Sequence, residues 1–104
     1  MKKIYNKLVR DKILEILKIK GKEFKYHIAD NKEYGEKLWE KLQEEIGEFK
    51  ENSSVEEMAD IVEVITAIAK FHKIDLKKLE IKRYDKRYER GAFDNKIILE
   101  EADE

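Results

Sequence analysis

Apolar residues recur every three to four positions along most of the chain, which is the spacing of one face of a helix. The first such stretch covers residues 6–20 and ends at Gly21, a residue type that commonly stops helices. Apolar and polar residues then alternate over residues 23–29, a pattern typical of a short extended segment. The sequence therefore predicts a helix followed by a brief extended piece.

Three more helices are predicted from the capping residues at their starts. Asp30 or Asn31 can cap a helix that continues to about residue 51. The serines and glutamates of residues 53–57 have capping-box spacing and open a helix that reaches residue 72. Asp75 can cap a last helix that ends near residue 90, where Gly91 follows. We expect an all-α fold, a four-helix bundle with minor extended segments, in a single domain over residues 1–104.

Composition supports the all-α class and reduces the number of functions that the chain could have. Charged residues make up 45% of the chain and Pro is absent, a balance that favours solvated helices over turn-rich β-sandwiches. The formal net charge of -1 lacks the basic excess common in nucleic-acid-binding proteins. Because the chain has no Cys, it has neither a thiol nucleophile nor a Cys-based metal site. With no apolar run of membrane-spanning length, we expect a soluble cytoplasmic protein without a membrane partner.

Charge is unevenly distributed along the chain. Residues 30–60 hold 4 basic against 11 acidic residues, whereas residues 1–29 hold 9 against 3 and residues 70–90 hold 9 against 4. An acidic middle thus stands between two basic flanks. Solvation of helix surfaces accounts for most of these charges, and it predicts that carboxylates lie on polar helix faces.

Two carboxylates of the second predicted helix break this expectation. At about 100° per residue, Leu38, Leu42 and Phe49 fall on one arc of that helix. Glu45 lies inside the arc, where the spacing requires an apolar side chain, and Glu48 lies on its margin.

The third predicted helix carries a matching pair. It is apolar around most of its circumference, yet Glu57 and Asp60 stand away from its polar strip and bracket the apolar stripe that continues from Ile61. A short turn makes the two helices antiparallel, so residues whose numbers have the same sum lie at similar heights. Glu45 should therefore face Asp60, and Glu48 should face Glu57.

Four partly buried carboxylates repel one another unless protons or cations neutralise them. A ligand set made only of oxygen, without His or Cys, suits a hard cation such as Mg2+ or Mn2+ rather than Zn2+. The alternative is a structural cluster that Lys or Arg from neighbouring helices neutralises. We favour a metal site formed by Glu45, Glu48, Glu57 and Asp60.

These residues resemble known motifs. The runs Glu44-Glu45-Ile46-Gly47-Glu48 and Glu57-Met58-Ala59-Asp60 are similar to the EExxE and ExxD motifs of the MazG-like superfamily of all-α nucleoside triphosphate pyrophosphohydrolases. The stretches Tyr5-Asn6-Lys7-Leu8-Val9-Arg10-Asp11-Lys12-Ile13 and Arg90-Gly91-Ala92-Phe93 resemble a small house-cleaning branch of that superfamily, so the likeness covers nearly the whole chain. Leu14 and Ala92 stand where branch members often have Pro and Gly.

The resemblance implies hydrolysis of a nucleoside triphosphate between its α and β phosphates, which would remove non-standard or surplus nucleotides. It places Mg2+ on Glu45, Glu48, Glu57 and Asp60 and catalytic roles on Glu44, Glu45 and Glu48, with Glu44 either behind the ligands or orienting water. Attack at the α phosphorus of a substrate with about four negative charges also needs other cations. The candidates lie on the basic fourth helix, namely Lys82, Lys86 and Arg90, and near the start, namely Lys7, Arg10 and Lys12. We favour Lys86 and Arg90 and add Lys7 and Arg10 as the predicted substrate-binding residues.

Two other functions stay open. Phosphoribosyl-ATP pyrophosphohydrolase uses a related helical scaffold, and a non-catalytic helical module could bind nucleic acid through the basic fourth helix. The apolar helices of so short a chain also predict a homo-oligomer, a dimer or higher, as in relatives of the resembled family.

Overall fold

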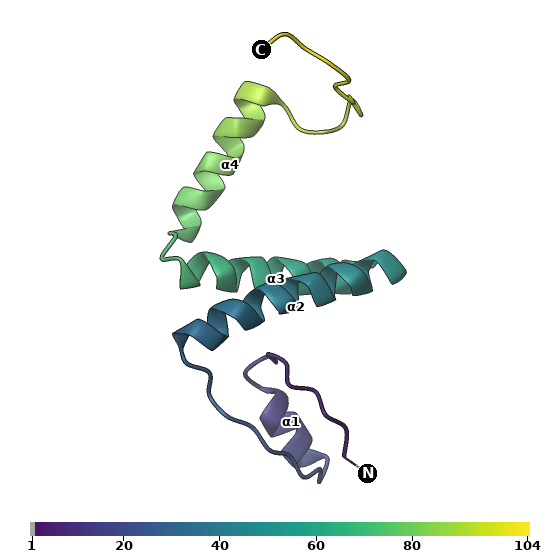
Figure 1. Ribbon diagram of the computed structural model, residues 1–104, viewed down its shortest axis with the longest axis vertical. Coiled ribbons are helices and arrows are strands. Elements are labelled where there is room, and N and C mark those ends of the chain that lie inside the picture. The colour runs from purple at the N-terminus through teal and green to yellow at the C-terminus, as the bar shows by residue number, and fades with distance from the viewer. Residues whose placement is uncertain (1) are drawn as a thin grey trace.

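The computed structural model describes residues 2–104, and within them it contains four helices and no strand (Figure 1). They are α1 (Ile13–Ile19), α2 (Asn31–Glu51), α3 (Val55–Phe71) and α4 (Leu76–Arg90). The expected all-α class is therefore confirmed. Over the described residues, none of the helices combines the length and the apolar character that a bilayer crossing needs.

One predicted helix differs from the structure, because α1 begins at Ile13 rather than at residue 6. The short extended piece expected at residues 23–29, for which the sequence left strand and loop open, is a loop. The backbone of Asn6 has φ 45°, outside the helical region, and its carbonyl accepts a hydrogen bond from Lys37 Nζ at 2.8 Å. This contact with α2 holds the chain away from a helical path. Residues 23–29 have no neighbouring strand among residues 2–104, so their alternating pattern has no ladder to join.

The helix starts follow the predicted capping residues. Asp30 caps α2 by accepting a hydrogen bond from the backbone N–H of Glu33 at 2.8 Å. Ser54 caps α3 in the same way through the N–H of Glu57 at 3.2 Å. Asp75 accepts from two N–H groups at the start of α4. Each cap satisfies donors that a helix leaves free at its first turn, so local sequence determines where these three helices begin.

The packed centre of the chain is the antiparallel hairpin of α2 and α3, which share most of their length (Figure 1). Its buried apolar residues are Leu38 on α2 and Val64 and Ala69 on α3, and of these Leu38 is fully buried. Near the open end of the hairpin the helices approach closely at Gly35, where an added Cβ would lie 3.0 Å from the ring of Phe71. This small core aligns the facing sides of the two helices and so positions the carboxylates between them.

The other two helices leave this hairpin largely uncovered. α4 departs from the end of α3 and diverges from it, while α1 lies on the opposite side of the hairpin (Figure 1). The radius of gyration is 18.4 Å, whereas a compact chain of this length would have about 13 Å. Within residues 2–104, α1 and α4 do not make the contacts that would close a four-helix bundle.

Candidate metal centre

Three carboxylates meet between α2 and α3. One oxygen from each of Glu45, Glu57 and Asp60 lies within 4.8 Å of the other two. Glu45 comes from the middle of α2, and the other two come from the first turns of α3, one helical turn apart. The prediction that Glu45 meets Asp60 across the hairpin is therefore confirmed. The cap at Ser54 contributes, because it sets where α3 begins and hence which of its residues face Glu45.

Glu48, the fourth predicted ligand, stands at the edge of this group. Its side chain is exposed, and it contributes no oxygen to the three-residue cluster. It is nevertheless close enough to Glu45 for its charge and a hydrogen bond to act on the Glu45 carboxyl. One turn of helix separates the two residues, and this turn carries Glu48 toward solvent while Glu45 points into the hairpin.

Burial makes this cluster different from a surface patch of acid groups. Glu45 is only 6% exposed, and its Oε2 atom is buried without a hydrogen-bond partner. Oε2 of Glu57 is buried and unpartnered in the same way. An unsatisfied buried carboxylate oxygen is costly, and a cation bound between these residues would satisfy both. The donor set, three carboxylates without nitrogen or sulfur, fits Mg2+ or Mn2+.

Lys41 is a member of the site that sequence reasoning missed. Its Nζ lies 3.3 Å from Glu45 Oε1 and 3.4 Å from Glu44 Oε2, and its side chain is largely buried. The available signal was its spacing, since residues three and four positions apart on a helix are neighbours. Burial raises the pKa of Glu45 and the adjacent Glu48 adds to the rise, whereas Lys41 opposes it. The pKa of Glu45 stands above its ordinary value as a result.

The N-terminal strap, residues 6–12, brings two of the predicted cations to the cluster. Lys7 Nζ lies 2.7 Å from Glu44 Oε1, and the Arg10 guanidinium lies 2.6 Å from Asp60 Oδ1. Burial alone would raise the pKa of Glu44, but the hydrogen bond from Lys7 and the charge of Lys41 outweigh it and lower this pKa. The same hydrogen bond raises the pKa of Lys7. Basic residues of the first flank thus reach the acidic middle of the chain.

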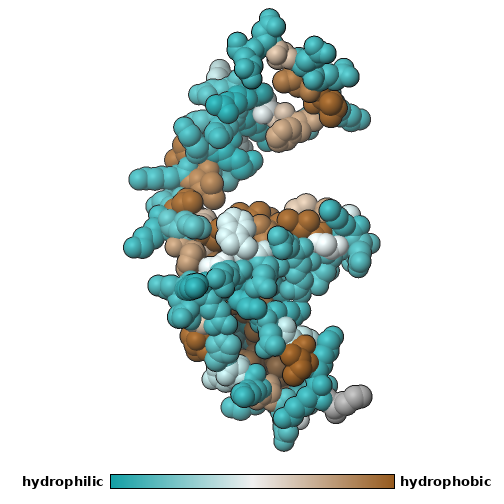
Figure 2. Space-filling view, viewed as in Figure 1, coloured by the Kyte–Doolittle hydropathy of each residue, from teal (hydrophilic) through white to brown (hydrophobic). Residues whose placement is uncertain are grey.

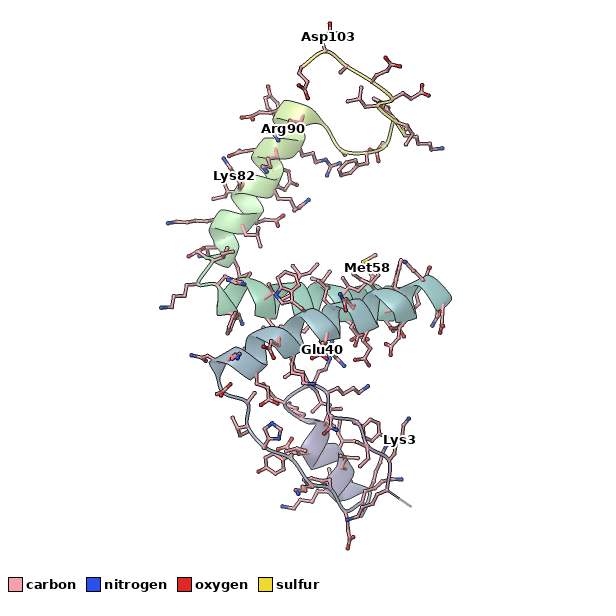
Figure 3. The ribbon with its side chains drawn as sticks, in the orientation of Figure 1. Lys3, Glu40, Met58, Lys82, Arg90 and Asp103 are labelled. Atoms are coloured by element: carbon pink, nitrogen blue, oxygen red, sulfur yellow. The ribbon has the colours of Figure 1, made fainter. Side chains whose placement is uncertain are left out.

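The other two predicted cations lie elsewhere. Lys86 and Arg90 belong to α4, and Arg90 lies at the far end of that helix from the hairpin (Figure 3). Arg90 borders a hollow of about 490 Å³ formed with residues 91–98. In the described part of the chain, neither residue forms an ion pair with the carboxylates of α2 or α3.

Fold and site together define an all-α chain with an acidic group, partly buried, that could hold a metal ion. Comparison of the chain with protein-family models, with curated proteins and with solved structures finds no match.

Proposed function

We propose that this protein is a nucleotide pyrophosphohydrolase that uses Mg2+, or Mn2+ in its place. The proposal rests on one observation: Glu45 and Glu57 each have a buried carboxylate oxygen without a hydrogen-bond partner, and both residues belong to a group completed by Asp60. Buried oxygens of this kind are suited to a divalent cation. The motif resemblance of the same residues supplies the reaction, cleavage of a nucleoside triphosphate between the α and β phosphates.

The carboxylates of the site have different roles in the proposed reaction. Glu45, Glu57 and Asp60 would hold the cation, with Glu48 at the solvent side able to add a ligand oxygen. When bound, the cation supplies neutralisation of phosphate charge and acidifies a bound water. Glu44, held ionised by Lys7 and Lys41, would accept a hydrogen bond from the attacking water and orient it.

Electrostatics also requires cations on the substrate side. Carboxylates alone would repel a triphosphate, and the positive groups beside them are Lys7, Arg10 and the more deeply buried Lys41. Lys86 and Arg90 would serve the same purpose only after α4 moves or from a second copy of the chain. We therefore assign the first phosphate contacts to the N-terminal strap.

Product analysis tests the proposed reaction. The purified chain is incubated with a panel of ribo- and deoxyribonucleoside triphosphates, with Mg2+ or with chelator, and pyrophosphate is scored separately from phosphate. Pyrophosphate should appear only with Mg2+. Glu45→Gln and Asp60→Asn should lower kcat/KM at least roughly 100-fold, because each removes a metal ligand. Glu63→Gln, on the exposed polar strip of α3, is the matched control and should keep full activity.

Three outcomes would contradict this assignment. Full activity of Asp60→Asn would show that the cluster is not the metal site. Turnover of phosphoribosyl-ATP but of no free triphosphate would favour the related enzyme of histidine synthesis. No turnover by a folded protein, together with steeply salt-dependent binding of nucleic acid, would favour a binding module that uses α4.

We also propose that the chain works as a homo-oligomer. Four apolar residues of α3 recur at three- and four-residue spacing on the side away from α2 and remain exposed, namely Val55, Met58, Val62 and Ile65. Met58 is seen on the side of the hairpin turned toward α4, and apolar atoms gather along that edge (Figures 2 and 3). The stripe carries no charged residue, so two copies could pack it together in antiparallel fashion.

Light scattering at micromolar concentration tests this assembly, and we expect the mass of a dimer or a larger oligomer. Val62→Lys should shift the mass to that of the monomer, because it places a charge in the middle of the stripe. Glu63→Lys, one position further on and outside the stripe, should leave the assembly intact. A monomeric wild-type protein would contradict the proposal.

A further inference from the structure

The N-terminal strap is fixed to the hairpin at three points. Lys37 Nζ donates to the carbonyl of Asn6 at 2.8 Å, Lys7 pairs with Glu44 at 2.7 Å, and Arg10 pairs with Asp60 at 2.6 Å. The last pair joins residues fifty positions apart in the sequence. Of these contacts, only the one made by Arg10 falls on a member of the three-carboxylate group.

We propose that Arg10 is the exchangeable counter-cation of Asp60: it neutralises this carboxylate when no metal is bound, and a divalent cation displaces it. This inference rests on the proposed metal site. A metal ion held by Asp60 would sit about 2 Å from a carboxylate oxygen, so a guanidinium on that carboxylate would be only a few ångströms from a second cation. The two positive groups therefore compete for one carboxylate.

The burial of each group decides which cation prevails. The Arg10 and Asp60 side chains are 55% and 37% exposed, so their ion pair is a weak one that solvent screens. A divalent cation would instead satisfy the buried, unpartnered oxygens of Glu45 and Glu57, which Arg10 leaves without partners. The divalent cation is thus favoured over Arg10 at Asp60, and only the Arg10–Asp60 ion pair has to break.

The released guanidinium stays near the site. Lys7 and Asn6 hold the strap through residues outside the three-carboxylate group, and Arg10 is only three positions beyond Lys7, a reach of about 10 Å. Arg stays charged at any working pH, and its planar group matches phosphate oxygens. Metal binding would therefore place a divalent cation among the carboxylates and release Arg10 from Asp60, so that the guanidinium could contact the substrate phosphates.

Calorimetric titration of the metal-free protein with Mn2+ alone measures this competition. Arg10→Gln should bind Mn2+ with a Kd roughly two- to fivefold lower than that of wild type, the range expected for loss of a half-exposed ion pair. Lys12→Gln is the matched control, because it removes an equal charge from the same strap at a residue without an ion pair among residues 2–104. Its Kd should stay at the wild-type value. Arg10→Lys, which keeps the charge, should fall between wild type and Arg10→Gln.

A second measurement follows the side chain itself. NMR of ¹⁵N-labelled arginine side chains should show the Arg10 guanidinium hydrogen-bonded in chelator and in fast exchange with solvent at saturating Mg2+. In Asp60→Asn, the guanidinium should be in fast exchange under both conditions. Circular dichroism checks that each variant keeps its helices.

Several results would overturn the exchange. They are equal Mn2+ affinities of Arg10→Gln and wild type, a weaker affinity of Arg10→Gln, or a guanidinium signal that Mg2+ leaves unchanged. If wild type binds Mg2+ and releases Arg10 but produces no pyrophosphate, the proposed reaction fails and the exchange stands. If wild type takes up no divalent cation, both are refuted.

Discussion

Arg10 and Asp60 form an ion pair of 2.6 Å between the N-terminal strap and the second turn of α3. The pair carries a cation from the basic first flank of the chain onto one of the three carboxylates that meet in the hairpin. Because both side chains are half-exposed, its contribution to stability is at most about 1 kcal/mol. Its main consequence is to place positive charge beside the three-carboxylate group.

Removing the buried charge of Glu45 should stabilise the metal-free protein. Glu45→Gln keeps the shape of the side chain, ends its repulsion with neighbouring carboxylates, and places an uncharged amide beside Glu57 and Asp60. We expect about 1 kcal/mol greater free energy of unfolding in chelator. Denaturant unfolding measures it, and Mg2+ should raise the stability of wild type but not that of the variant. If the variant is less stable than wild type in chelator, the buried charge of Glu45 does not destabilise the metal-free protein and the prediction is wrong.

The Lys7–Glu44 pair should stabilise the fold only within a pH window. The pKa of Glu44 is lowered, so its contribution is present above the ordinary value of 4.5 and is lost as pH falls through the folded-state pKa. The pKa of Lys7 is raised, so its contribution is present below 10.5 and is lost as pH rises through the folded-state value. Between these limits, Lys7→Gln should be less stable than wild type by up to about 1 kcal/mol. Unfolding curves from pH 3 to pH 11 test this, and a difference that is independent of pH would refute it.

Two glycines of α2 should respond differently to the same substitution. A Cβ at Gly47 would meet nothing within 4 Å, so Gly47→Ala should gain about 0.5–1 kcal/mol from helix propensity. A Cβ at Gly35 would lie 3.0 Å from Phe71, whose ring also packs edge-on against Tyr34. Gly35→Ala should therefore be less stable than Gly47→Ala by about 1 kcal/mol. Thermal unfolding compares the two, and equal stabilities would show that the helices are not in close contact at Gly35.

The turn after α3 should favour glycine at Lys73. This residue has φ 58°, and the N–H of Ile74 bonds to the carbonyl of Ala69 in the pattern of a Schellman motif. Lys73→Gly should stabilise the protein by about 0.5–1 kcal/mol, because glycine adopts positive φ without steric cost. Lys70→Gly, three positions earlier and inside α3, should instead cost about 1 kcal/mol. Chemical denaturation of both variants checks the opposite signs.

Local sequence was sufficient for the starts of three helices and for the meeting of Glu45 with Asp60. Asp75 is predicted as a cap, and Asp30 and Ser54 are each one of two neighbouring candidates. Prediction works here because each side chain bonds to backbone only two or three residues away. The meeting of Glu45 with Asp60 followed from helical periodicity and a short turn, both of which depend on residue spacing alone.

Tertiary structure decided what the spacing could not. Periodicity predicted a helix from residue 6, but contacts with Lys37, Glu44 and Asp60, between 31 and 50 positions away, hold this segment as an extended strap. The same contacts bring Lys7 and Arg10 to the carboxylates, while the divergence of α4 keeps Lys86 and Arg90 away. The sequence by itself thus determined the starts of α2, α3 and α4 and the meeting of Glu45 with Asp60, but not the start of α1. The expected pairing of Glu48 with Glu57 was wrong, because Glu57 joins Glu45 and Asp60 while Glu48 lies outside their group. The cations beside these carboxylates depend on how separate segments pack, which no local pattern of residues specifies.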